Sequence, residues 1–272
     1  MGTLGIISIV IILVTVFVSY KGFNDRNFYS KYNFVVEHIL VYKEYRRVVT
    51  SGFLHINWMH LIFNMITLYF FSGALEFSLG PVNFLIVYLV GLIGGNLFSL
   101  LIHKNAGDYS AVGSSGAVNA VIFATIALFP GMTIFIFIPA WLFGIAYVLY
   151  SIYAIRSRKD NVGHDAHLGG GIAGMLVAII MHPSALVENY LPILLIAVPS
   201  IVFIYIIITN PGILLVDSFF YNKNHFYNID QKYNFEKKRQ QDELDDLLDK
   251  INKKGMSSLS SKEKQRLKEL SR

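Results

Sequence analysis

The stretch Gly113-Ser114-Ser115-Gly116-Ala117-Val118 opens one apolar segment of this chain, and His164-Asp165-Ala166-His167-Leu168-Gly169-Gly170-Gly171-Ile172-Ala173-Gly174 opens another. Ser115 and His167 therefore each stand just inside a segment that can form a membrane-spanning helix. A serine and a histidine in these places suggest a nucleophile and a base held below the membrane surface. Neither residue is decisive alone, so independent features of the sequence have to agree with the pair.

The composition is that of a polytopic helical membrane protein. Of the 272 residues, 54% are hydrophobic and only 15% are charged, and the mean hydropathy is +0.51. A soluble domain of this length carries about 25% charge. Cys is absent, which excludes disulfides and Cys-ligated metals or clusters. The net charge of +5 comes largely from loops and a basic tail, and it gives no indication of nucleic-acid binding.

Apolar segments predict seven transmembrane helices, at residues 4–20, 57–77, 82–102, 114–129, 132–154, 165–182 and 190–209. The segments are too long and too evenly apolar for the alternating strands of a membrane barrel. The first segment lacks a basic n-region and a cleavage site, so we expect it to be retained as a span. Pro130-Gly131 predicts a tight hairpin between the fourth and fifth helices.

The domain organisation follows from these segments. We expect a catalytic core over residues 1–182, a seventh span within 183–215, and a polar tail over 216–272. The long first loop, 21–54, mixes charge with aromatics, so it either holds a fold of its own or lies in the membrane interface. The tail predicts a helix–loop–helix over 242–270, either as a partner-binding or regulatory element or as a solvated extension.

Two sequence patterns define the tail helices. The first helix, over 242–251, carries an apolar face and is expected to stop at Gly255. The face consists of Leu244, Leu247, Leu248 and Ile251. The second helix begins with a capping box, Ser260 followed by Glu263, and runs through Leu270.

Polar residues also mark the start of the second span. His60 and Asn64 are spaced i,i+4 and share one helix face, and His55 lies just before that helix. Polar side chains on an apolar helix are costly unless they are partnered inside the bundle. Two interpretations stay open for these residues taken alone: a hydrogen-bonding pair that fastens helices together, or the polar part of a site.

The start of the fourth span suits an anion. Backbone N–H groups at a helix N-terminus and the helix dipole favour negative charge near Ser115. The alternative is a small-residue packing seam capped by a serine. Gly170 and Gly174 form a GxxxG pair that allows close helix packing. If the neighbour is the helix that begins at Ser115, His167 comes within reach of the serine and can act as its base.

Together these residues resemble the rhomboid family of intramembrane serine proteases over about residues 1–182. The motifs are H-x4-H-x3-N, GxSG and A-H-x2-G-x3-G, carried by His55, His60, Asn64, Gly113, Ser115, Gly116, Ala166, His167, Gly170 and Gly174. Arg47 matches the Arg of a Trp-Arg pair that rhomboids often carry, with Arg46 in place of the Trp. Glu76, after Gly73, resembles the buried Glu of the family.

The resemblance implies a fold and a reaction. The fold is an all-α membrane protein built on a six-helix rhomboid bundle, to which this chain adds a seventh transmembrane helix and a short helical tail. The reaction is cleavage of transmembrane protein substrates within the lipid bilayer, without metal or other cofactor. Ser115 would attack the scissile carbonyl, and His167 would act first as base and then as acid.

The resemblance also assigns the supporting residues. The backbone N–H of Ser115 and the side chains of His60 and Asn64 would hold the oxyanion, with Gly113 and His55 in support, while Gly116, Gly170 and Gly174 would pack helices. One position departs from the family. Asn119 stands where many members place a tyrosine that stacks on the catalytic histidine, so we expect His167 to be oriented differently, by a hydrogen bond.

Other functions fit the sequence less well. A catalytically silent rhomboid-like binder or chaperone is the alternative, but such proteins usually lose the serine or the histidine, and both are present here. A transporter or channel is disfavoured because acidic residues within the spans are few and there is no inverted repeat. A zinc protease is disfavoured because HExxH is absent.

The location follows from the spans, but the orientation rests on two rules that disagree. We expect a multi-pass protein of the cell membrane, the inner membrane of a bacterium. All 23 Lys and Arg residues fall after odd-numbered spans, on the side of Ser115 and His167, which the positive-inside rule places in the cytoplasm. The family usually faces its active site outward. We expect the family orientation, which puts the tail outside if 190–209 crosses the membrane.

Overall fold

The computed structural model describes residues 5–134, 137–157 and 162–209, and near the C-terminus residues 244, 247, 248, 250–252, 256 and 259–270. The apolar helices in these ranges are α1 (Ile6–Asn24), α5 (Trp58–Leu79), α6 (Pro81–His103), α7 (Ser115–Leu128), α8 (Ala140–Ser157), α9 (His164–Met181) and α11 (Tyr190–Thr209). Five of them are long and apolar enough to cross a membrane, and α7 and α8 contribute shorter apolar stretches. The prediction of an all-α membrane bundle is confirmed.

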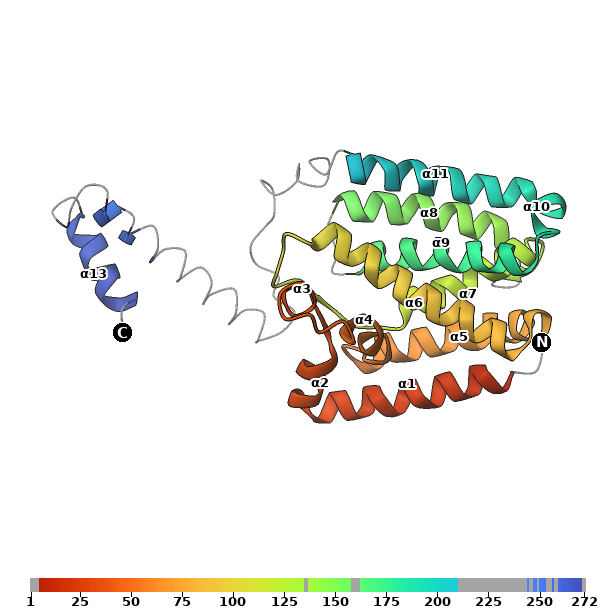
Figure 1. The fold of residues 1–272 in the computed structure, drawn as a ribbon, viewed down its shortest axis with the longest axis horizontal. Helices are drawn as coiled ribbons and strands as arrows, with labels where there is room; N and C mark the ends of the chain where they lie inside the picture. Colours follow the sequence, from red (N-terminus) through yellow and green to blue (C-terminus); the bar gives the residue numbers. More distant parts are fainter. Residues whose placement is uncertain are drawn as a thin grey trace. The chain divides into compact units, whose positions relative to one another are not determined.

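Successive apolar helices run in alternating directions (Figure 1). Short connections enforce this, because Gly80, with φ +79°, is the only residue between α5 and α6. As a result, α5, α7 and α9 begin at the end of the bundle where α1, α6, α8 and α11 finish. Ser115, His60 and His167 thus share one end of the bundle, which we call the Ser115 end.

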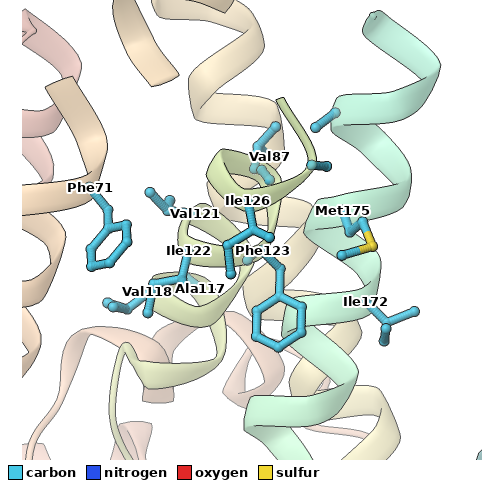
Figure 2. Packing of buried hydrophobic residues seen from close by; sticks show 14 of the residues in the cluster. Phe71, Val87, Ala117, Val118, Val121, Ile122, Phe123, Ile126, Ile172 and Met175 are labelled. Atoms are coloured by element: carbon cyan, nitrogen blue, oxygen red, sulfur yellow. The ribbon is translucent and has the colours of Figure 1, made fainter. Parts of the chain in front are cut away.

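Helix α7 forms the centre of the bundle. Every residue from Gly116 to Ala127 is buried, since α7 is enclosed by its neighbours. Figure 2 shows Phe71 of α5 on one side of α7, with Ile172 and Met175 of α9 on the other. Its 14 residues give a length of about 21 Å, which is shorter than the ~30 Å apolar core of a bilayer. A helix this short cannot present both ends to water.

The fifth predicted span, 132–154, is wrong at its start. Helix α8 begins only at Ala140, because Thr133–Ile134 (β3) and Ile138–Pro139 (β4) pair as antiparallel strands. The physical reason is Pro139. It has no N–H to donate, so it is favoured just before a helix or in its first turn, where that donor would be unpaired. The other six predicted spans agree with the structure to within four residues at either end.

The first loop holds a fold of its own. It contains α2 (Arg26–Tyr32), β1 (Phe34–Val35), α3 (Val36–Leu40), α4 (Arg47–Thr50) and the 3-10 helix η1 (Ser51–Phe53). Figure 1 shows α2, α3 and α4 gathered at one end of the bundle. Phe34, Val36, Ile39 and Val48 form a small apolar core. Of the two alternatives for this loop, the structure therefore supports a folded element.

Arg47 ties this loop together. Its side chain is only 4% exposed, and its guanidinium donates to the carbonyl oxygens of Ser30 and Asn33 and to the Glu44 carboxylate. The Arg47 guanidinium in turn holds the pKa of Glu44 below its usual value. Arg46, which stands at the Trp position of the family, is exposed, pairs with Glu44 and lies over the Tyr32 ring. The arginine that the resemblance matched is therefore the structural one.

Glu76 is buried, as the resemblance implies. Its carboxylate accepts hydrogen bonds from the backbone N–H groups of Ile7 and Ser8 and from the Ser8 hydroxyl. These amides belong to the first turn of α1, which has no partners within its own helix. Glu76 thus caps α1 and fixes it to α5.

The C-terminal unit, Ser218–Arg272, is described in part. Helix α13 (Ser261–Leu270) begins with the predicted capping box: Ser260 N donates to Glu263 Oε2 at 2.7 Å, and Glu263 N donates to Ser260 Oγ at 3.3 Å. Of the first predicted helix, 242–251, residues 244, 247, 248, 250 and 251 are helical. The rest of that helix and Gly255 lie outside the described residues.

The alternating helices predict which positions share a side of the membrane. The chain has no native Cys, so single cysteines can be labelled without background. Lys104→Cys and Thr209→Cys, both at exposed positions, should react with a membrane-impermeant maleimide from the same side, and Gly131→Cys from the opposite side. Labelling before and after permeabilisation distinguishes the sides. Reaction of Thr209→Cys together with Gly131→Cys would mean that α11 does not cross.

Candidate active site

Helices α7 and α9 touch through their backbones. A Cβ atom on Gly170 would overlap the Gly116 carbonyl group, and one on Gly174 would overlap the backbone of Ala120. A Cβ on Gly116 would in turn lie 3.3 Å from the Ala166 oxygen. Glycine at these positions is what lets two membrane helices approach so closely. The neighbour of the GxxxG pair is thus the helix that begins at Ser115.

This contact lies at the Ser115 end of both helices. Ser115 is the chain neighbour of Gly116, and His167 is the chain neighbour of Ala166, so the two side chains project from adjoining first turns. Helix α6 closes the third side, because a Cβ on Gly95 would overlap the Ala166 oxygen. Ser115, His167, Gly116, Gly170 and Gly174 are therefore brought to one place.

The two serines of the GSSG turn have different surroundings. Ser114 is fully buried and lies against His55, whose Nε2 is 3.2 Å from Ser114 Oγ. Ser115 is the first residue of α7 and is partly exposed. Its hydroxyl is therefore the one of the pair that a substrate can reach.

His55 connects the GSSG turn to α1 by hydrogen bonds. Ser19 Oγ donates its single proton to the Phe53 carbonyl, so His55 Nδ1, at 2.9 Å, donates to Ser19 Oγ. His55 Nε2 then accepts from the Ser114 backbone N–H at 3.4 Å. Burial, together with the nearby His60, lowers the pKa of His55 to about 3, which keeps the ring neutral. His55 precedes α5 and acts as a structural hydrogen-bonding group that connects α1 to the GSSG turn.

Gly113 and His60 lie directly beside Ser115. Gly113 has φ +135°, a conformation that favours glycine, and its amide donates to the Ser51 carbonyl at 3.1 Å. A Cβ at this position would sit 2.6 Å from His60 Cε1, and 3.7 Å from Ser115 Oγ. Glycine is thus required both for the turn and for the approach of the His60 ring, whose Nε2 faces the same spot.

Asn64 is buried on the same face of α5 but makes a local bond. Its Nδ2 donates to the His60 carbonyl at 2.9 Å within α5. One N–H of the amide is therefore engaged by the helix, and the second is the one that an oxyanion would need. The recorded bond of the Asn64 amide therefore lies within α5 and not at the GSSG turn.

His167 has a partner that the sequence did not predict. Its Nδ1 lies 2.9 Å from the hydroxyl of Tyr147, which belongs to α8. Asn119, where the family often has tyrosine, donates through Nδ2 to the Ser115 carbonyl at 2.8 Å. The one signal in the sequence was the missing tyrosine at Asn119, which required another group to orient His167 but did not say which.

Within the described residues, no three His, Asp or Glu side chains are grouped so that they could hold a metal ion. The chemistry available here comes from a hydroxyl, an imidazole, a helix N-terminus and the neighbouring His60. That set suits nucleophilic attack on a carbonyl followed by stabilisation of an oxyanion.

Comparison with known proteins agrees with this arrangement. The Rhomboid domain matches residues 42–184, more than half of the 272 residues. The chain belongs to the rhomboid family. Residues 227–272 match a separate family of unknown function, DUF6576. The rhomboid match contains every residue of the candidate site, and the second match falls within the tail.

Relatives of this rhomboid come from mitochondria and from a bacterium. RHOMBOID-like protein 12, mitochondrial, of Arabidopsis thaliana is 34% identical over 61% of this chain and 54% of its own length. Rhomboid protein 1, mitochondrial, of Saccharomyces cerevisiae is 31% identical over 53% of this chain and 45% of its own length. The rhomboid YdcA of Bacillus subtilis is 39% identical over 28% of this chain and 37% of its own length. The chain thus spans about half the length of the first two.

Gly170→Ala should destabilise this rhomboid. The new methyl group would overlap the Gly116 backbone, which cannot move aside as a flexible side chain could. Such overpacking costs about 1–3 kcal/mol, measured as a lower thermal midpoint in detergent or lipid. Gly163→Ala is the matched control, since its nearest neighbours would be at 3.8 Å. Equal midpoints for the two variants would contradict the close contact.

Acid should weaken the fold through His55. Its pKa is about 3 in the folded protein against an ordinary value of 6.5, so the unfolded chain binds a proton that the folded chain does not. The contribution of neutral His55 to the free energy of unfolding is fully present above pH 6.5. It decreases as the pH drops toward 3, by up to about 1.4 kcal/mol per pH unit. His55→Gln should show a shallower decrease between pH 6.5 and 4.5. The control is His182→Gln, at an exposed position; an unchanged slope in His55→Gln would refute the assignment.

Proposed function

We propose that this rhomboid is an intramembrane serine endopeptidase with a Ser115–His167 dyad. His167 Nε2 removes the proton of Ser115, the serine oxygen attacks a peptide carbonyl, and the imidazolium then protonates the leaving amine. Water releases the acyl group from Ser115 by the same two proton transfers in reverse. The observation that carries this proposal is the backbone contact between α7 and α9, at the point where the two residues stand.

The polar groups around Ser115 support an oxyanion site. The first amides of α7 have no partner within the helix, and its dipole favours negative charge at Ser115. The His60 ring lies against Gly113, on the same side as Ser115 Oγ. We assign the Ser115 N–H and His60 as the principal donors, with Asn64 contributing its remaining N–H. Gly113 and His55 support them by shaping and holding the turn.

The substrates that fit this proposal are transmembrane segments of other proteins in the bilayer. Two features support this class. The site opens at the end of a helix too short to cross the membrane, and the exposed side chains of the bundle are largely apolar. The relatives' names assign two of them to mitochondria, while YdcA belongs to a bacterium. This rhomboid is a multi-pass membrane protein. We propose that it lies in a bacterial cell membrane, with the Ser115 end of the bundle facing outward.

We propose three segments for the chain. Residues 1–182 form the catalytic core, 183–215 carry the seventh span, and 216–272 form a tail that binds a partner or regulates the enzyme. The apolar helix α11 supports the second assignment, and the separate match over 227–272 supports the third.

A fluorophosphonate probe tests the dyad without knowledge of the substrate. Ser115→Ala and His167→Ala should each reduce labelling of the folded protein in membranes by at least about a hundredfold, since the nucleophile or its base is removed. Ser114→Ala is the matched control and should still be labelled, because Ser114 is buried. Full labelling of either dyad variant, with the thermal midpoint preserved, would overturn the proposal and leave the non-catalytic alternative.

A further inference from the structure

Tyr147 is a polar neighbour of His167 that the proposed dyad does not use. Its hydroxyl lies 2.9 Å from His167 Nδ1, and the two rings are 6.5 Å apart at 24°. That ring separation is long for stacking, so the contact is a hydrogen bond through the hydroxyl. Tyr147 comes from α8, whereas the serine comes from α7 and the histidine from α9.

The acidic residue near His167 in the sequence is engaged elsewhere. Asp165 precedes His167 by two residues, but its Oδ2 lies 3.3 Å from His103 Nε2 on α6. His164 approaches His167 edge-on, with ring centroids 5.7 Å apart, and packs against Tyr150. The group that the structure places at His167 Nδ1 is the Tyr147 hydroxyl.

The direction of this hydrogen bond follows from the proposed reaction. If His167 Nε2 takes the Ser115 proton, Nε2 must be unprotonated, and the ring proton is on Nδ1. Nδ1–H then donates to the Tyr147 oxygen. The hydroxyl proton of Tyr147 is then free to be donated to a different acceptor.

Asn119 and Ser151 provide the place for that proton. Both flank the Tyr147 hydroxyl. Asn119 Oδ1 and Ser151 Oγ are buried and have no hydrogen-bond partner of good geometry within the described residues. Asn119 Nδ2 is already bonded to the Ser115 carbonyl, which leaves its oxygen as the acceptor. A hydroxyl placed between an N–H donor and these acceptors can satisfy both.

We propose that Tyr147 is a positioning residue that fixes the tautomer and ring orientation of His167, with Asn119 orienting the tyrosine in turn. The inference rests on the proposed function, because it concerns the same dyad. A tyrosine at position 119 is not needed when α8 supplies the hydroxyl. The short Asn119 side chain leaves the Tyr147 oxygen within reach of α9. Helix α8 therefore takes part in the site through the Tyr147 hydroxyl.

Tyr147→Phe tests this inference, because it removes the hydroxyl and keeps the ring that packs on Phe123 and Phe143. Fluorophosphonate labelling of the full chain in membranes gives kinact and KI separately. We expect kinact to fall about tenfold, the effect of one hydrogen bond, with KI unchanged within twofold. Tyr153→Phe, the same change at an exposed position of α8, should match wild type in both constants.

A second measurement reads the tautomer directly. Selective ¹⁵N labelling of histidine, with His167→Gln to assign the signal, should show His167 protonated on Nδ1 in wild type. Tyr147→Phe should show a mixture of both tautomers at an unchanged thermal midpoint. Wild-type kinact and an unchanged tautomer in Tyr147→Phe would overturn the inference while leaving the dyad intact. Absence of Ser115-dependent labelling in wild type would instead overturn the proposed function.

Discussion

The backbone contact between α7 and α9 is the constraint on which the rest of the structure depends. Gly170 packs on the Gly116 backbone, and Gly174 packs on the backbone and the small side chain of Ala120. In a bilayer there is no hydrophobic force to press helices together, so close packing of small residues has to supply the attraction. The same contact that stabilises the centre of the bundle also places the first turns of both helices side by side. These glycines therefore both stabilise the bundle and set the geometry of the site.

Several buried polar groups in the rest of the bundle and in the first loop are paired by hydrogen bonds. Glu76 caps α1, Arg47 binds the carbonyls of the first loop, and His55 connects Ser19 to the GSSG turn. Each is buried where an unpaired polar group would be costly. Of these groups, His55 bonds directly to the turn before Ser115, and the Gly113 amide adds a bond to the Ser51 carbonyl. These bonds leave Ser115 itself partly exposed, at the N-terminus of a helix too short to cross the membrane.

The sequence predicts most of the helices and the residues at their starts, but not the contacts that the bundle makes between helices. Long apolar segments predict helices well. The start of α8 was missed because the residues of β3 and β4 are as apolar as a membrane span, and Pro139 is the one sign in this apolar run that the helix starts later. The GxxxG pair predicted a close contact, but the identity of its partner helix depends on how the bundle packs. Tyr147 could not be found among the 16 tyrosines of the chain, because its role depends on the approach of α8 to α9. Asn64 was expected near the serine, and its amide is partly engaged within its own helix.

The central claim is that Ser115, and not its neighbour, is the residue that His167 activates. Peptide mapping by mass spectrometry of the fluorophosphonate-treated protein tests this most directly, since Ser114 and Ser115 are adjacent and give distinct fragment ions. The account predicts a single adduct on Ser115, lost when the protein is unfolded before treatment. An adduct on Ser114 or on a residue away from the contact of α7 with α9, or no adduct on the folded chain, would contradict it.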